Sequence, residues 1–241
     1  MGEADIAMYQ GRNRDALRIL EAGIAADLKS GDALDPRPKY VALAEAKLAM
    51  GDRSGAAEAA LKAIQGTRQE SVLVPAARVL LDVGRQEDAE RIAADLENRL
   101  QRQTLAYAKL LDGEQSLRRN RLASALEALR DSAKRNESWF AHYALGRTYL
   151  QAGQFAQALQ EFDWCFKHKG LAGDAFIADS STLRYFAPVQ YWLGRAQQGL
   201  GSIDAAQRNY REFGALRQNA DPPDPLAADA ARRLAGPPSP R

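Results

Sequence analysis

The stretch "LGRTYLQAGQFAQALQEF" at residues 145–162 returns in altered form as "LGRAQQGLGSIDAAQRNY" at residues 193–210. Both copies open with Leu-Gly-Arg, carry a second glycine in the middle and close with an alanine four residues before an aromatic residue. Apolar residues recur at helical intervals on either side of that middle glycine. A glycine between two such runs ends the first helix by adopting a left-handed conformation. The stretch therefore predicts a helical hairpin that the chain uses more than once.

The same hairpin signal runs along the whole chain. The residues expected between paired helices are Gly11, Gly51, Gly84, Asn120, Gly153 and Gly201. Their separations are 40, 33, 36, 33 and 48 residues, which fits a repeat of about 34 residues with insertions. Prolines cluster at a few joints, and no run of alternating β-branched residues predicts a strand. The sequence therefore predicts an all-α protein built from repeated hairpins.

The fifth hairpin resembles the tetratricopeptide repeat (TPR). The family pattern, W-x2-L-G-x2-Y followed by A-x3-F, has as its counterparts His142, Leu145, Gly146, Tyr149, Ala158 and Phe162, with histidine in place of tryptophan. Small residues in this pattern let the two helices of a hairpin touch, while large residues fill the space between hairpins. The resemblance implies a right-handed α-solenoid of about six TPR-like hairpins with a C-terminal cap helix.

The predicted units divide the chain almost completely. They lie near residues 1–30, 37–66, 70–100, 102–135, 138–169 and 185–218, with an insertion at 169–187, a cap helix at 224–235 and a disordered tail at 236–241. Asp224 is a candidate N-cap of the cap helix, with Pro225 at its first position. The first hairpin is expected to be truncated, because Gly11 comes so early. A truncated end exposes an apolar face, so the alternatives are a missing upstream segment or a first helix that is short and mobile. A homodimer through this repeat is a further open alternative.

Composition and charge narrow the classes of function. Lys and Arg number 33 against 31 Asp and Glu, spread along the chain, so we expect no nucleic-acid partner. Two histidines, one cysteine and the absence of a P-loop, an HExxH or a nucleophile elbow predict no enzyme, no cofactor and no metal site. No apolar run is long enough to span a bilayer and the N-terminus lacks a signal peptide. We expect no membrane insertion and a cytoplasmic protein, or a periplasmic one if a longer chain carries an anchor.

The expected function is to bind a protein or peptide in the concave groove of the solenoid. The resemblance implies that the fifth and ninth positions of each first helix line this groove. The fifth positions are Val41, Val74, Leu110, Tyr143 and Tyr191, and the ninth are Glu45, Arg78, Glu114, Arg147 and Arg195. Tyrosine and arginine anchor peptides well, so the candidate contacts are Tyr143, Arg147, Tyr191, Arg195, Arg78 and Glu114. The alternative is that Arg147 and Arg195 only solvate the groove.

The insertion is a second candidate surface. Its polar turn from Asp179 to Thr182 leads into Arg184, Tyr185 and Phe186, and loops of this length inside an array are often functional. Residues 139–235 also resemble the C-terminal TPR segment found behind bacterial eukaryotic-like serine/threonine kinases and related multidomain signalling proteins. That resemblance implies an alternative function, as a regulatory, sensor or substrate-recruiting segment of a larger signalling protein.

Overall fold

The chain folds into successive pairs of helices. A computed structural model describes residues 1–30, 35–173 and 182–235, and within them every regular element is helical. The pairs are α1 (Gly2–Tyr9) with α2 (Asn13–Lys29), α3 (Arg37–Ala49) with α4 (Arg53–Ile64), α5 (Glu70–Val83) with α6 (Gln86–Glu97), α7 (Arg102–Arg118) with α8 (Leu122–Arg135), α9 (Trp139–Gln151) with α10 (Phe155–Lys167), and α12 (Val189–Gly199) with α13 (Ile203–Leu216). A short α11 (Lys169–Gly173) and a 3-10 turn, η2 (Leu183–Phe186), precede α12, and α14 (Pro225–Ala235) follows α13.

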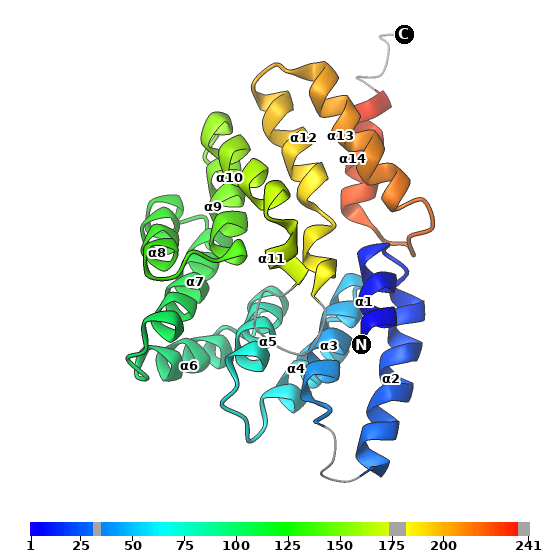
Figure 1. Cartoon of the computed structure of the whole chain (residues 1–241), viewed down its shortest axis with the longest axis vertical. Helices are drawn as coiled ribbons and strands as arrows, with labels where there is room; N and C mark the ends of the chain where they lie inside the picture. The colour runs from blue at the N-terminus through cyan, green and yellow to red at the C-terminus, as the bar shows by residue number, and fades with distance from the viewer. Residues whose placement is uncertain (31–34, 174–181, 236–241) are drawn as a thin grey trace.

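The pairs stack side by side into a curved array. The chain runs from α1 and α2 through α7 and α8 on the far side of the molecule, and α12 to α14 return to lie beside α1 (Figure 1). The predicted all-α solenoid class is confirmed. The predicted tail and Asp179 of the insertion lie outside the described residues.

The hairpin turns have the backbone conformation that the sequence pattern requires. The residues between paired helices have positive φ at all the aligned positions: Gly11, Gly51, Gly84, Asn120, Gly153 and Gly201. Gly153, at φ +71°, ends α9 in the left-handed region, which other residues enter only at a cost. Asn120 is the one substitute for glycine in this set, and asparagine tolerates this region better than most residues.

The repeated motif of the opening stretch is one contact between two helices. A Cβ atom added to Gly146 on α9 would lie 2.7 Å from the ring of Phe162 on α10. In the last pair, a Cβ on Gly194 would lie 2.6 Å from the ring of Tyr210. Both rings are buried. The ring therefore occupies the space that the glycine leaves in each hairpin.

We expect Gly146→Ala to lower the free energy of unfolding. Alanine favours a helix over glycine by about 1 kcal/mol, but here its methyl group would overlap the buried Phe162 ring, and overpacking costs about 1 to 3 kcal/mol. Gly214→Ala on α13 is the matched control, because nothing lies within 4 Å of its added Cβ, and it should stabilise the protein by about 0.5 to 1 kcal/mol. Urea denaturation of both variants measures the difference. Two stabilising substitutions would show that the Gly146 contact is loose.

The two ends of the array meet. The backbone N–H of Asp221, after α13, donates to the carbonyl of Gly11 at 2.9 Å, and the Asp221 carboxylate accepts from the N–H of Arg14 at 2.8 Å. Ala4 and Ala7 of α1 are buried, and η2 packs against this helix. The apolar face that the short first hairpin was expected to expose is therefore covered in part by the C-terminal half of the chain, while Ile6 of α1 is 50% exposed. Self-association through that repeat stays a prediction.

Candidate functional site

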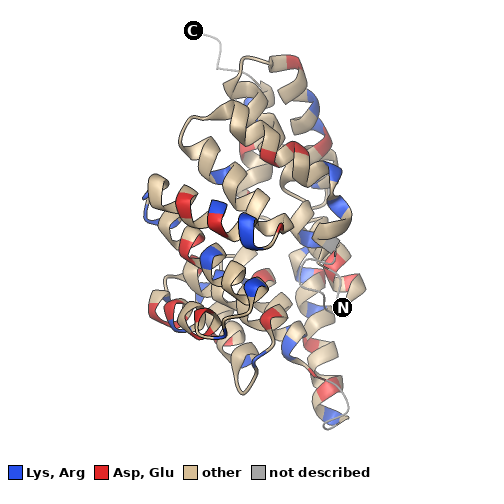
Figure 2. Ribbon diagram, turned by 60° about the vertical axis from the view of Figure 1, so that its left-hand side comes forward, with Lys and Arg blue, Asp and Glu red and all other residues tan. Residues whose placement is uncertain are grey.

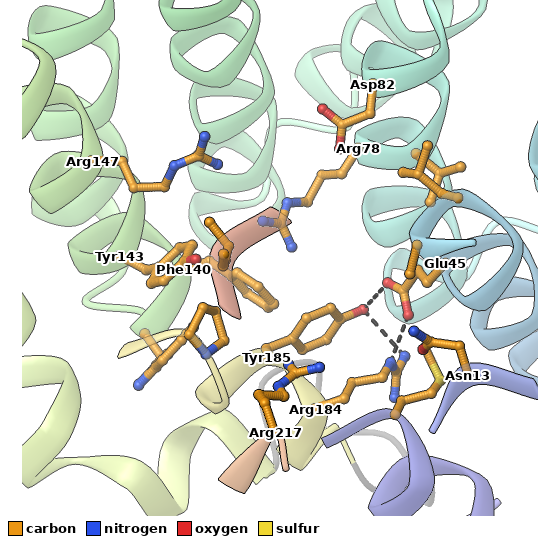
Figure 3. A pocket seen from close by; sticks show the side chains of 17 residues that line it. Asn13, Glu45, Arg78, Asp82, Phe140, Tyr143, Arg147, Arg184, Tyr185 and Arg217 are labelled. Atoms are coloured by element: carbon orange, nitrogen blue, oxygen red, sulfur yellow. Dashed lines mark hydrogen bonds and ion pairs between the residues drawn. The ribbon is translucent and has the colours of Figure 1, made fainter. Parts of the chain in front are cut away.

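The insertion enters the concave side of the array. The side chain of Arg184 is 6% exposed, and its guanidinium bridges two carboxylates: Nη1 lies 2.9 Å from Asp5 Oδ1 on α1, and Nε lies 2.6 Å from Glu45 Oε2 on α3. The N–H of Leu183 donates to the same Asp5 carboxylate at 2.9 Å. Arg184 thus connects the insertion to two N-terminal hairpins (Figure 3).

The next residue of the insertion continues this contact. The Tyr185 hydroxyl donates to Glu45, and its ring meets the Phe140 ring edge-on with centroids 4.8 Å apart. The Arg78 guanidinium lies over the Phe140 ring, 4.3 Å from its centroid. Burial raises the pKa of Tyr185, although the nearby Arg184 opposes the change. Tyr185 therefore remains a neutral hydrogen-bond donor at neutral pH.

Two of the three candidate residues of the insertion are buried. Phe186 is buried beside Phe166, and Arg184 is buried as well, whereas Tyr185 is half-buried. Asp5 and Glu45 offer Arg184 a pair of anionic partners inside the groove. Arg184 and Tyr185 form part of the groove wall, and the binding role of all three residues stays a prediction.

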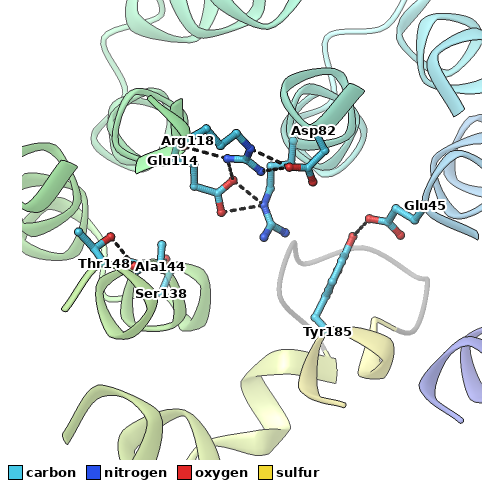
Figure 4. A network of polar contacts seen from close by, with 10 residues as sticks. Glu45, Asp82, Glu114, Arg118, Ser138, Ala144, Thr148 and Tyr185 are labelled. Carbon is cyan, nitrogen blue, oxygen red and sulfur yellow. Dashed lines mark hydrogen bonds and ion pairs between the residues drawn. The ribbon is translucent and has the colours of Figure 1, made fainter. Parts of the chain in front are cut away.

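A ladder of charged residues links α5 to α7 beside this wall. Arg78 Nε lies 3.0 Å from both oxygens of Glu114, and Arg118 bonds Asp82 at 2.7 Å (Figure 4). Burial by itself raises the pKa of Glu114, but Arg78 and Arg118 overcome it and lower the pKa to about 2. Arg78 and Glu114, both predicted groove residues, thus bind each other within the protein.

The cap helix covers the C-terminal end of the predicted groove. The Tyr191 hydroxyl donates to Asp229 of α14 at 2.7 Å, and Arg195 Nη1 donates to the same hydroxyl at 3.0 Å. Tyr191 is buried by this contact. Tyr191 and Arg195 are therefore separated from the other predicted contacts, and they hold α14 in place.

Tyr143 and Arg147 of α9 lie on the concave side, where Tyr143 is buried and Arg147 is half-buried. The Tyr143 hydroxyl accepts a hydrogen bond from Trp192 Nε1 at 2.8 Å, and its ring stacks on Trp139 with centroids 5.0 Å apart. The half-buried guanidinium of Arg147 lies 5.4 Å from the Trp192 ring centroid. Within the described part of the chain, no carboxylate lies within ion-pair distance of Arg147. Arg147 is thus the predicted contact most available to a ligand.

A cavity of about 320 Å³ lies between these elements. Its lining includes the predicted residues Arg78, Tyr143, Arg147, Arg184 and Tyr185, together with Glu45, Asp82, Trp139 and Phe140. Figure 3 shows Arg147, Arg78 and Arg217 around the same space. A smaller cavity of about 180 Å³ adjoins it and is lined by Glu114, Arg118 and Arg147. The two cavities share Asp82 and Arg147 in their walls.

Part of the lining could not be found by counting repeat positions. Met8 and Asn13 come from the first hairpin, whereas Arg217 and Leu226 come from the segment around the last connection. These residues meet because the ends of the array close on each other. The only sequence signal for them was the short first hairpin, which left room for the C-terminal segment.

Known structures with the same arrangement are TPR proteins. No family model matches the sequence, and a search of curated proteins finds no match. The crystal structure of TTC0263, a thermophilic TPR protein in Thermus thermophilus, superposes with a TM-score of 0.53 at 20% identity, over 83% of this chain and 99% of that one. This chain has a TPR fold.

Two more distant structures are also similar to this chain. MamA gives a TM-score of 0.45 at 20% identity, over 73% of this chain and 95% of that one. A tetratricopeptide repeat protein from Parabacteroides merdae ATCC 43184 gives 0.43 at 11% identity, over 97% of this chain and 98% of that one.

The surface of this TPR fold carries charges of both signs. Lys, Arg, Asp and Glu are interspersed along the helices (Figure 2). Among the described residues, no helix is both long and apolar enough to cross a membrane. In the same ranges, no group of three or more His, Cys, Asp or Glu side chains could hold a metal ion. The distinctive feature of the molecule is therefore the cavity on its concave side.

Proposed function

We propose that this chain is a non-catalytic scaffold that binds a protein or peptide partner on its concave side, where the insertion forms one wall of the binding surface. The supporting observation is the position of Arg147, a half-buried guanidinium beside Tyr143 and Trp192 with no carboxylate partner among the described residues. Arginine and aromatic side chains dominate the energetics of many interfaces. A partner that supplies a carboxylate would form an ion pair with Arg147.

Arg147→Glu is expected to weaken partner binding at least tenfold, because it reverses the charge at the centre of the proposed surface. Peptides selected from a random library on the wild-type protein would supply the ligands, and fluorescence anisotropy would give their affinities. Arg18→Glu is the control, since it reverses the charge of a side chain on α2 that is 75% exposed and lines neither cavity. Equal affinities for wild type and Arg147→Glu would place the binding surface elsewhere.

The alternative proposal is a regulatory, sensor or substrate-recruiting segment of a larger bacterial serine/threonine kinase or signalling protein. Its support is the resemblance of residues 139–235 to TPR segments of such proteins. An antibody raised against this region would report the mass of the native gene product. A product much larger than 26.4 kDa favours this alternative, and one near that mass favours a free adaptor.

A further inference from the structure

The charged groups that line the cavity of about 320 Å³ leave one cation unmatched. Its four arginines are Arg78, Arg147, Arg184 and Arg217, and its two acids are Glu45 and Asp82. Glu45 is bound to Arg184, and Asp82 is bound to Arg118, which lies outside the cavity wall. Arg78 pairs with Glu114. Of the four lining arginines, Arg147 alone has no carboxylate within 4.0 Å in the described residues. Arg184 faces two carboxylates, so the cavity as a whole carries no excess positive charge, and it is the part of the wall around Arg147 that favours an anion.

Two further residues of the cavity wall each carry an unused hydrogen-bond donor. Nε of Arg217 is buried and has no hydrogen-bond partner in the described structure. The Tyr143 hydroxyl accepts from Trp192 and, within the same ranges, donates to no other group. Arg147 and Arg217 each interact electrostatically with Tyr143. Figure 3 shows Arg147 and Arg217 on opposite sides of the cavity. A carboxylate beside Arg147 would accept from this guanidinium and from the Tyr143 hydroxyl of the same helix, and bonds to a charged donor of this kind are strong.

A buried amide offers another unused polar group. Asn13 is 7% exposed, lines the cavity near Glu45, and its side chain makes no hydrogen bond among the described residues. Buried polar side chains normally have partners. Its position across the cavity from Arg147 (Figure 3) leaves it available to a polar substituent at the far end of a ligand.

The rest of the lining is apolar and aromatic. Met8, Leu48, Val79 and Leu226 contribute aliphatic surface, whereas the rings of Trp139 and Phe140 in the same wall are mostly covered by Tyr143 and Arg78. Small-molecule sites commonly combine such a lining with a few convergent polar groups in a volume of about 300 to 1,000 Å³. The ligand that fits therefore has an apolar body as well as an anionic group.

We propose that this cavity binds a small organic acid, with its carboxylate held by Arg147 and the Tyr143 hydroxyl and its apolar body against the half-buried side chains of Leu48 and Leu226. The inference goes beyond the proposed scaffold function, because it requires no protein partner. A cationic ligand would meet the unmatched Arg147, and a neutral one would leave Arg147 without an anionic partner.

Isothermal titration calorimetry on the full chain tests this with 3-phenylpropionate, indole-3-acetate and octanoate as probes. Each acid is compared with its primary amide, which has nearly the same shape but no charge. We expect at least one acid to bind, and its amide to bind at least tenfold more weakly. Failure of all three acids to bind at millimolar concentration, or equal binding of acid and amide, would overturn the proposal.

Variants identify the site. Arg147→Gln should weaken the acid at least tenfold while keeping the melting temperature, because Arg147 makes no ion pair in the described structure. Arg147→Lys keeps the charge but loses the planar guanidinium, so its affinity for the acid should lie between those of wild type and Arg147→Gln. This variant also provides a test if the glutamine variant is unstable. Arg18→Gln is the control, because the Arg18 side chain on α2 is 75% exposed and lines neither cavity, and it should change affinity less than twofold. Equal losses for Arg147→Gln and Arg18→Gln would contradict the assigned site. Partner-peptide affinities are measured separately, so either proposal can fail alone.

Discussion

Arg184→Met is expected to lower the free energy of unfolding by about 3 to 5 kcal/mol, the cost of removing one member of a buried ion pair. Methionine fills a similar volume but leaves Asp5, which is 1% exposed, without its guanidinium partner. Glu45 loses a contact of 2.6 Å at the same time. The unfolding transition should also broaden. Arg184 connects hairpins that are far apart in the chain, and without this connection each repeat contacts only its neighbours, so the array unfolds less cooperatively. Urea denaturation followed by far-UV circular dichroism measures both effects.

Two further variants distinguish the loss of the Arg184 ion pairs from the general effect of replacing an arginine. Arg232→Met removes a guanidinium whose side chain is 77% exposed and which pairs with Asp229 at 3.0 Å, and surface pairs contribute only about 0 to 1 kcal/mol. The triple variant Arg184→Met, Asp5→Asn, Glu45→Gln removes the stranded charges and should recover part of the loss. A wild-type midpoint for Arg184→Met would show that the insertion does not hold the two ends together.

The fold could be predicted because its determinants are local in sequence. Gly146 and Phe162 lie within one hairpin, and Gly153 between them ends the first helix at positive φ. The contacts of these residues lie within one repeat, so they appear in the sequence as a periodic pattern. Stacking of successive hairpins then follows from burial of the apolar faces that the pattern creates.

The candidate site could be predicted only in part, because it depends on contacts outside that period. Repeat counting placed Tyr143 and Arg147 on the concave side, where the structure has them. It could not show that Arg184 would bind Asp5 across 179 residues of chain. Nor could it show that Arg217 would lie beside the first hairpin. These contacts form because the two ends of the array meet. Their meeting decides which of the predicted groove residues remain accessible to a ligand.

Glu114→Gln is expected to remove a pH-dependent part of the stability. The folded pKa of Glu114 is about 2, below the ordinary value of 4.5, so its contribution is fully present above pH 4.5 and is lost as the pH falls towards 2. A shift of this size corresponds to about 3 kcal/mol. At neutral pH the variant also leaves the buried Arg78 without a carboxylate partner. The stability difference between wild type and variant should therefore be largest at neutral pH and shrink in acid.

Denaturation by urea at a series of pH values measures this difference directly. Glu58→Gln is the matched control, because Glu58 also pairs with a cation, Lys62 at 2.8 Å, but its side chain is 67% exposed. Solvent screens that pair, so its loss should change the pH profile little. If Glu114→Gln and wild type keep a constant difference from neutral pH down to pH 2, the carboxylate is not held in its charged form by Arg78 and Arg118. The ladder would then stabilise α5 against α7 through packing alone.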